Sequence, residues 1–443
     1  MLRPTTRFFV RFADRWMPDP LVVAIFLTFV CIAAALVFTD FGVLDAGEAW
    51  GIGFWKLLAF TMQIVLILGL GHLVAHTNVT HRLLVKIADQ VRSAKMAYAG
   101  LAFIAGFCGL FSWGLALIAP AVLSRIIGAS CKRRGIKLHF PLLVACGWLG
   151  FGTSMQGLSA SIPLMVNTPG HFLESQTGLI ALSATIFSIW SMSIVATKLV
   201  AIPFVVSLLA PPPKEVREMP ELGSTAEVTV DTKTKAEMTP SERVENARII
   251  TLSLAALGTF YLIVHYTRGG SLNLNTINMI FLVLGLALAD SPKHYLELLS
   301  NAGRVVAPFI IQYPLYAGIM GVIAVSGLGE LIVQSFVAIS DKDSLPIWTF
   351  FSAGLLNLFV PSAGGQLAIQ GPIAVDAALQ LGADIPRVLM ALTIGEAWTN
   401  AIQPLYAIPV LAVAGLHVRD VMGYGVIICM LTGTIYLTAL ILF

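Results

Sequence analysis

The strongest constraint on the fold is a set of interruptions that recurs in two halves of the chain, about 250 residues apart. Clusters of Gly, Ser, Thr, Asn, Gln and Pro break the apolar stretches of each half, and these breaks keep a common register. Leu110–Phe111 returns as Leu358–Phe359, and Gly147 returns as Gly395. Paired interruptions of this kind in a membrane protein predict a transport site near the middle of the bilayer.

The composition requires a membrane environment. The 443 residues are 57% hydrophobic and 12% charged, whereas a soluble domain carries about 25% charged residues. Apolar runs of about 20 residues, of which Leu21–Phe38 is the clearest, are long enough to cross a bilayer as helices. We therefore expect an all-α integral membrane protein with about nine full spans and two re-entrant hairpins.

The distribution of Lys and Arg orients the predicted spans, because cytoplasmic loops are enriched in them. The basic N-terminal arm before Pro20 predicts a cytoplasmic N-terminus, and Phe41–Ile52, which has no Lys or Arg, is expected to be an external loop. Asn78–Lys95 has an apolar face and several basic residues, which indicates an amphipathic helix on the cytoplasmic surface. With this number of spans, the C-terminus is predicted to be periplasmic.

We interpret residues 1–210 as a first transmembrane repeat. Residues 96–128 would reach about 50 Å as one helix, which is longer than the hydrocarbon core of about 30 Å. Ser112–Gly114 interrupts them and both flanks are basic, so they predict a re-entrant hairpin that enters from the cytoplasm. Residues 138–165 predict an outward helix that is broken near Gly147–Gly157.

The second half is predicted to be inverted. A polar linker at 211–247, expected to be flexible and cytoplasmic, precedes an extra span at 248–268 that has no counterpart in the first half. The second repeat, 269–443, therefore starts from the opposite side of the membrane. Gly327–Ser340 is the counterpart of the basic surface helix and has no Lys or Arg, which agrees with an external position.

Two further interruptions complete the predicted second repeat. Residues 345–377, broken at Pro361–Gln366, form a hairpin expected to enter from outside, and residues 386–413 form a helix broken near Gly395–Pro404. The four breaks of the two repeats should then meet. Such a fold consists of two inverted-topology repeats, each with a re-entrant helical hairpin and a broken transmembrane helix.

The residues of the breaks are the candidate site. Free N–H groups at helix N-termini suit a carboxylate, and unwound carbonyls and hydroxyls suit a small cation such as Na⁺. We expect no cofactor, and Na⁺ is a candidate bound ion only. The alternative is that small residues allow close helix packing and that amides join helices. The substrate-binding candidates are Ser112, Gly114, Thr153, Ser154, Gln156, Ser362, Gly364, Gly365, Gln366, Thr399, Asn400 and Gln403. The coupling-ion candidates are Glu396, Ser112, Ser362 and Thr399.

Two charged residues stand out within apolar segments. Glu396 is the one acid deep in a broken segment, and an ionisable residue inside the membrane is a functional candidate. It is a candidate proton carrier or cation ligand, with a structural pairing as the alternative. Lys198 lies near the cytoplasmic half of a predicted span and is expected to snorkel to the surface.

At its interruptions the chain resembles the short-chain fatty acid transporter family, which includes bacterial AtoE-type uptake proteins. The stretches that carry the resemblance are Arg11–Pro20, Gly147–Gly170 and Asn357–Pro372, and the similarity extends along the whole length except the linker. The PSAGGQ sequence of Pro361–Gln366 also resembles ion-coupled carboxylate transporters with inverted hairpin repeats. The resemblance implies uptake of short monocarboxylates such as butyrate or acetoacetate across a bacterial inner membrane, and leaves the coupling ion open.

We therefore hypothesise a secondary active transporter that imports short-chain fatty acid anions with Na⁺ or H⁺. No GxxxxGK[ST] motif is present, so an ion gradient is the expected driving force. Its expected partners are a small carboxylate and the lipid bilayer, with no nucleic acid and, by analogy alone, a homodimer. The alternatives are a C4-dicarboxylate carrier or a Na⁺/H⁺ exchanger of the same architecture, a passive channel, and a membrane-embedded enzyme. The absence of Arg from the breaks favours a monoanion, and the absence of HExxH disfavours an enzyme.

Overall fold

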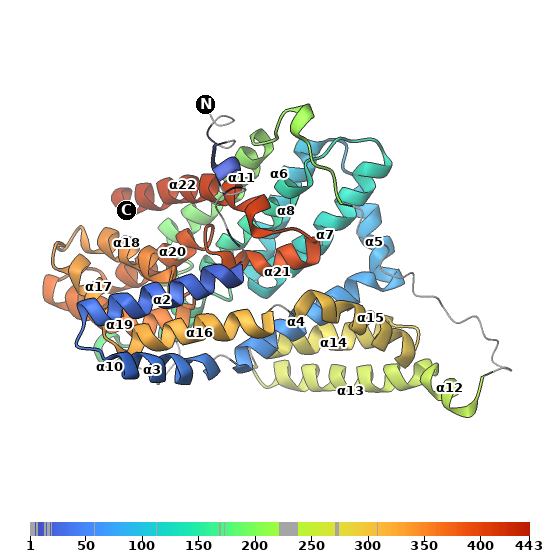
Figure 1. Cartoon of the computed structure of the whole chain (residues 1–443), viewed down its shortest axis with the longest axis horizontal. Helices are drawn as coiled ribbons and strands as arrows, with labels where there is room; N and C mark the ends of the chain where they lie inside the picture. Colours follow the sequence, from blue (N-terminus) through green and yellow to red (C-terminus); the bar gives the residue numbers. More distant parts are fainter. Residues whose placement is uncertain are drawn as a thin grey trace.

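The computed structural model describes residues 5, 8–12, 15, 18, 20–56, 58–111, 113–167, 170, 171, 173–220, 238–270, 274–307 and 309–443. Across these residues the secondary structure is helical, without a strand. The helices form two layers that lie side by side along the long axis of the molecule (Figure 1).

The first layer supports the second. In this layer α16 packs on α2 and α3, α4 packs on α14 and α15, and α13 packs on α14. The backbones of α3 and α16 meet closely, because a Cβ atom on Gly53 would lie only 2.8 Å from the Ala317 carbonyl oxygen. Its helices are α2 (Pro20–Phe38), α3 (Val43–Trp55), α4 (Leu58–His76), α13 (Arg248–Thr267), α14 (Leu274–Leu288), α15 (Pro292–Val306) and α16 (Phe309–Val325).

The second layer contains the interrupted segments of both halves. From the first half it contains α5 (Asn78–Asp89), α6 (Ala94–Phe111), α7 (Trp113–Arg133), α8 (Phe140–Leu149), the 3₁₀ turn η1 (Gly150–Gln156), α9 (Ser161–Val166), α10 (Glu174–Thr177), η2 (Leu182–Ala184) and α11 (Ile189–Leu208). From the second half it contains α17 (Leu328–Val337), α18 (Leu345–Asn357), α19 (Ala363–Leu381), α20 (Ile385–Thr399), α21 (Pro404–Ala414) and α22 (Val418–Leu442). Short elements η3 (Pro213–Glu215) and α12 (Pro240–Glu245) lie between the halves.

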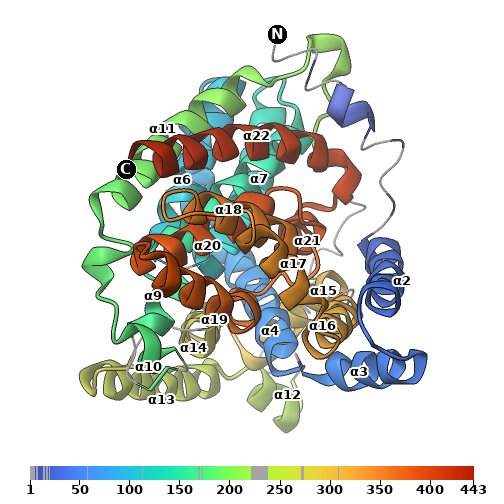
Figure 2. The same ribbon diagram turned by 90° about the vertical axis from the view of Figure 1, so that its left-hand side faces the viewer.

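The two halves of this layer are arranged from opposite ends. The helices α5, α6 and α7 lie toward one end of the long axis, and α17, α18 and α19 lie toward the other (Figure 1). Each first hairpin arm packs on its own broken segment, α6 on α8 and η1, and α18 on α20. The last helices of the two halves, α11 and α22, run side by side (Figure 2).

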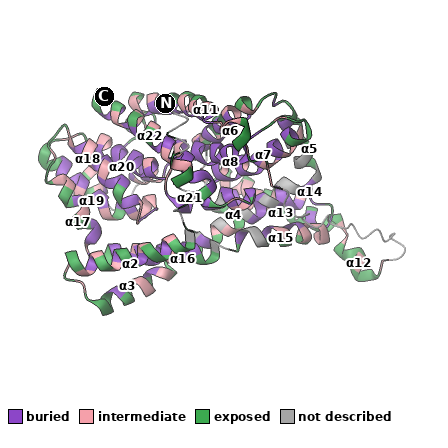
Figure 3. Cartoon of the chain, turned by 45° about the horizontal axis from the view of Figure 1, so that its top comes forward, coloured by how far each residue is buried: buried purple, intermediate pink, exposed green. Residues whose placement is uncertain are grey.

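Burial separates the centre of the second layer from the lipid-facing surface. Every residue of α8 is buried, as are most residues of α20, whereas α13 exposes large apolar side chains along its length (Figure 3). In a membrane protein the exposed apolar surface faces lipid and the polar groups lie inside. The interrupted segments therefore occupy the part of the molecule that is shielded from lipid.

Six helices among the described residues are long and apolar enough to cross a membrane, and the pair α16 and α17, bent by 63°, would add a seventh as one span. The expected nine spans remain a prediction. Two of the six are α6 and α7, the arms of the predicted first hairpin, and each reaches about 30 Å at 1.5 Å per residue. The six are Leu21–Phe38, Ala94–Phe111, Trp113–Arg133, Ile189–Leu208, Pro240–Thr267 and Val418–Leu442.

The expected external loop at Phe41–Ile52 is mostly helical, because α3 begins at Val43. The Asp45 carboxylate accepts the backbone N–H of Gly42 at 3.1 Å and so stabilises the start of the helix. The lack of Lys and Arg in this segment predicts its side of the membrane, but it does not distinguish a helix from an irregular loop.

The beginning of the predicted flexible linker is anchored. The Arg217 guanidinium forms a 2.8 Å ion pair with Asp420 at the start of α22, and its backbone N–H donates to His139 Nδ1 at 3.0 Å. Burial, with a smaller effect of Arg217, lowers the pKa of His139 to about 4. An unfolded histidine has a pKa of about 6.5. The neutral ring therefore stabilises the fold above that pH, and this contribution is lost as the pH falls toward 4.

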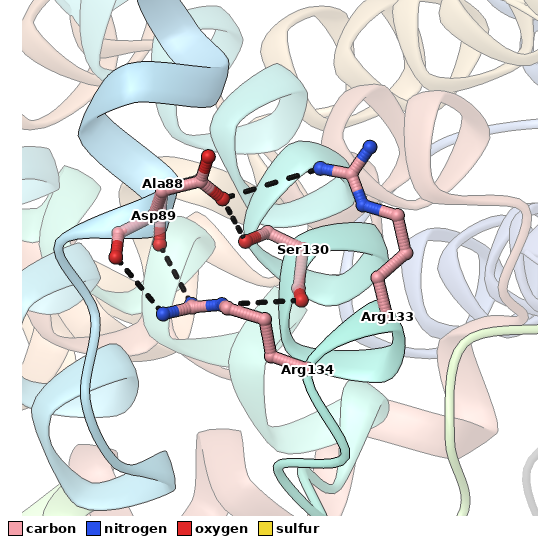
Figure 4. Close-up of polar contacts among 5 residues, drawn as sticks. All are labelled: Ala88, Asp89, Ser130, Arg133 and Arg134. Carbon is pink, nitrogen blue, oxygen red and sulfur yellow. Dashed lines mark hydrogen bonds and ion pairs between the residues drawn. The ribbon is translucent and has the colours of Figure 1, made fainter.

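A polar cluster attaches the surface helix α5 to the end of α7 (Figure 4). The Arg134 guanidinium donates to the carbonyl oxygens of Ala88 and Asp89 at 3.0 and 2.9 Å, which adds a charged donor at the C-terminus of α5. Ser130 donates to the Asp89 carboxylate, whereas Arg133 lies 4.0 Å from it with an exposed side chain. Arg134 is therefore the main link between the two helices.

We expect Arg134→Ala to lower the free energy of unfolding by about 1–2 kcal/mol, because two carbonyl groups lose a charged donor. Arg133→Ala is the matched control, with an expected change below about 0.5 kcal/mol for an exposed ion pair. Thermal denaturation of both purified variants in detergent measures the difference. Equal losses in the two variants would contradict the assignment.

Candidate functional site

A cavity of about 240 Å³ lies where the interruptions of the two halves meet. Both hairpin tips, both broken segments and α16 contribute to its wall. The lining residues are Trp113, Leu117, Phe151, Met155, Ser161, Tyr313, Tyr316, Met320, Pro361, Ser362, Ala363, Gly364, Glu396, Leu405 and Tyr406.

Most of the wall is apolar or aromatic. Leu117 and Met155 come from the first half, and Met320 and Leu405 come from the second. The rings of Phe151 and Tyr406 lie 5.4 Å apart and connect η1 to α21. Among the described residues, no lysine, arginine or histidine lines the cavity. A ligand would therefore meet apolar contacts over most of its surface.

The start of α19 forms one polar part of the wall. Ser362 is the residue before the helix, and its hydroxyl accepts the backbone N–H of Gly365 at 3.4 Å. The N–H groups of Ala363 and Gly364 lie in the first helical turn, where they have no acceptor within the helix. These N–H groups, together with the positive end of the helix dipole, are suited to an anion.

Among the described residues, Glu396 supplies the only carboxyl group of the wall. Glu396 is 0% exposed, and its carboxyl oxygens have no partner at full hydrogen-bond geometry, although the Tyr406 hydroxyl lies close enough to interact with them. The neighbouring Tyr406 hydroxyl donates instead to the Pro361 carbonyl oxygen at 3.0 Å. A buried carboxylate without a partner would be strongly unfavourable, so this group requires a proton, a cation or a ligand donor in at least part of its working cycle.

A threonine in each half attaches the broken segment to its hairpin. The Thr153 hydroxyl donates to the Gly106 carbonyl oxygen at 2.6 Å, and the Thr399 hydroxyl donates to the Gly354 carbonyl oxygen at 2.9 Å. Gly106 and Gly354 lie on α6 and α18, the first arms of the two hairpins. They are separated by the same number of residues as Leu110 and Leu358, so they correspond in the two halves. The two halves therefore use the same contact to hold a broken helix beside its hairpin.

The structure shifts the expected alignment of the glycines. Gly395 lies against Ala353 of α18, with 2.8 Å between an added Cβ and the alanine Cβ. Gly150, not Gly147, makes the matching contact on α6, where an added Cβ would lie against the Ala105 Cβ. The reason is the winding: threonine follows glycine after three residues in the 3₁₀ turn η1 and after four in the α-helix α20.

Amide side chains hold the second break. Asn357 Nδ2 donates to Asn400 Oδ1 at 2.7 Å, to Thr399 Oγ1 at 3.0 Å and to the Glu396 carbonyl oxygen at 3.1 Å. Gln403 Nε2 donates to the Leu358 carbonyl oxygen at 2.9 Å. Asn357 Oδ1 and Asn400 Nδ2 are buried and have no partner. Asn357 was not among the expected site residues, although an asparagine within an apolar helix indicates a hydrogen bond to a neighbouring helix.

The interruptions of the second half are shorter than the sequence suggested, whereas the break of the first half comprises η1 and residues 157–160. In the second half α20 continues as a helix to Thr399, which leaves 400–403 as the break, and Gly364, Gly365 and Gln366 lie inside α19. An α-helix keeps its own hydrogen bonds, so in an apolar surrounding the chain leaves it over as few residues as possible.

The predicted residues fall into groups. Ser362, Gly364 and Glu396 line the cavity. The hydrogen-bonded residues that join segments are Thr153, Gln156, Gln366, Thr399, Asn400 and Gln403. Gly114 and Ser154 are buried outside the lining, Ser154 Oγ without a partner, and an added Cβ on Gly365 would lie 2.8 Å from Met320. Ser112 lies outside the described residues.

Several lining residues were not predicted. Met320 and the three tyrosines at 313, 316 and 406 come from positions that read as ordinary apolar sequence, and Trp113 lies in the predicted first tip but was not among its candidates. The expectation for Lys198 was wrong: its side chain is 1% exposed and points into the protein, where its ammonium donates to the Gly152 carbonyl oxygen at 2.6 Å. Tyr436 and Gln156 provide two more acceptors there. The ammonium therefore has three hydrogen-bond acceptors inside the protein and does not need water at the membrane surface.

Comparisons with known proteins place the chain in a family. The family described as "Short chain fatty acid transporter" matches residues 1–443. The chain is 37% identical to a protein of Escherichia coli (strain K12) named "Putative short-chain fatty acid transporter", over 100% of both chains. It is 34% identical to a protein of the same name from Haemophilus influenzae, over 99% of both. A solved structure, that of the Alcanivorax borkumensis YdaH transporter, gives a TM-score of 0.43 at 17% identity, covering 96% of this chain and 97% of that one.

The apolar helices and the full-length matches define a membrane transporter, not an enzyme. The chain belongs to the short-chain fatty acid transporter family, and the resemblance found in its sequence is confirmed.

We expect Thr399→Val to reduce the rate of short-chain fatty acid transport at least fivefold. Two buried hydrogen bonds to α18 are lost, one donated to Gly354 and one accepted from Asn357, and each is worth about 1 kcal/mol. Thr393→Val is the matched control, since Thr393 lies on the same helix and donates within it, to the Leu389 carbonyl oxygen. Uptake of labelled butyrate by proteoliposomes, normalised to folded protein, measures the effect. A similar loss in both variants would show that the hairpin contact is not the cause.

Proposed function

We propose that this transporter imports short-chain fatty acid anions such as butyrate or acetoacetate across a bacterial inner membrane, in symport with H⁺. The observation that carries the proposal is Glu396, a fully buried carboxyl group without a partner in the wall of an apolar cavity. Import with Na⁺ in place of H⁺ is the alternative, because oxygens of the breaks also suit a small cation.

The cavity supports a small monocarboxylate as the substrate. Its volume of about 240 Å³ is below the range of about 300–1,000 Å³ that is common for pockets of drug-sized ligands. An apolar wall favours a short hydrocarbon tail, and a second carboxylate would meet no basic side chain there. The substrate carboxylate would lie at Ser362–Gly364, with its tail along the apolar and aromatic part of the wall.

A proton on Glu396 would link the two transported species. A protonated carboxyl group donates a hydrogen bond to the substrate anion, whereas an ionised one repels it. Loading the proton therefore favours loading the anion, and release of either favours release of the other. Proton and anion would cross together as an electrically neutral pair.

The fold supports alternating access by an inverted pair of repeats, with the predicted boundaries at 1–210 and 269–443. Hairpins α6–α7 and α18–α19 extend from opposite ends of the second layer, and both tips reach the cavity (Figure 1). Movement of this layer against the first would open the cavity to each side in turn. The N-terminus would be cytoplasmic and the C-terminus periplasmic.

Labelled butyrate uptake into proteoliposomes, with Na⁺ and pH gradients imposed separately, tests the proposal. We expect accumulation when the outside is acidic, with no requirement for Na⁺, and competition by other short monocarboxylates but not by succinate. Protein-free liposomes measure the passive entry of butyric acid. Accumulation driven by Na⁺ alone would select the Na⁺ alternative, and competition by succinate without uptake of butyrate would refute the substrate class.

We expect Glu396→Gln to abolish accumulation driven by the pH gradient while butyrate still exchanges across the membrane, because glutamine donates a hydrogen bond but carries no proton through the cycle. Glu330→Gln, on the surface of α17, is the matched control and should behave as the unchanged protein. Accumulation by Glu396→Gln that still follows the pH gradient would exclude this carboxyl group as the coupling site.

A further inference from the structure

Lys198 lies in a cage of oxygen atoms inside the second layer. Its ammonium donates to the Gly152 carbonyl oxygen at 2.6 Å, to the Tyr436 hydroxyl at 2.7 Å and to Gln156 Oε1 at 3.2 Å. Three acceptors match the three donors of an ammonium group. The cage joins three elements, because Gly152 and Gln156 belong to η1, Lys198 to α11 and Tyr436 to α22.

The cage contains no negative charge. All three acceptors are neutral, and among the described residues no carboxylate forms an ion pair with Lys198. Lys198 is also the one lysine or arginine that is buried in the part of the chain that the structure describes. Burial of an unpaired charge is unfavourable, and an apolar side chain in the same space would cost less free energy of desolvation. The charge itself is therefore the feature that needs an explanation.

The cavity lies on the other side of the same turn. Phe151 and Met155 of η1 line the cavity, while Gly152 between them offers its carbonyl oxygen to the ammonium. The ammonium and the cavity lie on different sides of η1, and a helix with its side chains has a diameter of about 10 Å. Among the described residues the lining has no basic side chain of its own, and Lys198 is a buried cation that contacts the same turn as the cavity.

We propose that Lys198 is a tethered cation: its ammonium occupies an oxygen site in the first break that would suit a free cation, and its charge stabilises the anion in the cavity. This inference rests on the proposed function only in taking the anion to be the transported carboxylate. It holds whether H⁺ or Na⁺ is the coupling ion. The second break has no such lysine, so the exchangeable ion belongs on the side of Glu396.

Gln156→Glu separates the charge of Lys198 from its hydrogen bonds. The new carboxylate keeps an acceptor for the ammonium and neutralises it. Its second oxygen replaces the Nε2 that donates to Ser191 Oγ at 3.3 Å, and it can accept a hydrogen bond from that hydroxyl instead. Two charges about 10 Å apart at an effective dielectric constant of about 20 imply that the apparent KM for butyrate rises about tenfold. The melting temperature should stay close to that of the unchanged protein. An unchanged KM in the folded variant would overturn the proposal and leave Lys198 as a structural pin.

Lys198→Ala tests the oxygen site directly. Removal of the tether should leave a space that a small primary ammonium ion can enter, so methylammonium should raise the melting temperature of this variant by several degrees and partly restore butyrate uptake. Tetramethylammonium, which has no N–H donor, is the control ion, and the unchanged protein is the control for non-specific effects. Equal effects of the two ions, or equal effects on the unchanged protein, would refute the site.

The two variants, Gln156→Glu and Lys198→Ala, test the charge and the oxygen site independently. If Lys198→Ala does not fold, the conservative Gln156→Glu variant still tests the charge. If the unchanged protein transports no butyrate, the proposed function fails, while the melting temperature with methylammonium still decides whether the cage binds a cation.

Discussion

Everything in this structure depends on satisfying backbone groups where helices break inside an apolar layer. An unpaired N–H or carbonyl group at membrane depth costs several kcal/mol, so a break is tolerated only beside a donor or acceptor. Thr153 and Thr399 donate to carbonyl oxygens of the adjacent hairpin arms, and Gln403 donates to the end of α18. The hairpins are therefore the partners that allow the neighbouring helices to be interrupted at all.

The same requirement explains why the cavity is so sparsely polar. Most polar side chains of the breaks are used up in joining segments, which leaves Ser362 and the start of α19 on one part of the wall and Glu396 on another. Polar groups that face a cavity must find a partner in the substrate, the ion or water. A wall with few such groups suits a ligand with one polar end, whereas a ligand with two would leave one of them unmatched.

The sequence predicted the architecture better than the atomic roles. Low charge and long apolar runs predicted a helical membrane protein, and the recurring Gly and Ser clusters located the segments that meet at the cavity. The type of helix in the first break could not be predicted, because nothing in GFGTSMQ distinguishes a 3₁₀ turn from an α-helix. A constant offset therefore pairs Gly147 with Gly395, whereas the structure pairs Gly150 with Gly395. Polarity alone could not show which side chains face the cavity, because Thr399 and Ser362 look equally available until the hairpin is placed.

The anchored segment between the halves bears on which parts of the protein can move. Arg217 contacts the start of α8 through its backbone and the start of α22 through its side chain, so one residue of the connecting segment holds an element of each half. These two helices also pack on one another, as do α11 and α22. The two halves thus share one body within the second layer, in spite of their separate positions in the chain. If the second layer moves against the first, as proposed, the mechanical boundary of the transporter runs between the layers, and the boundary between the predicted repeats is not a hinge.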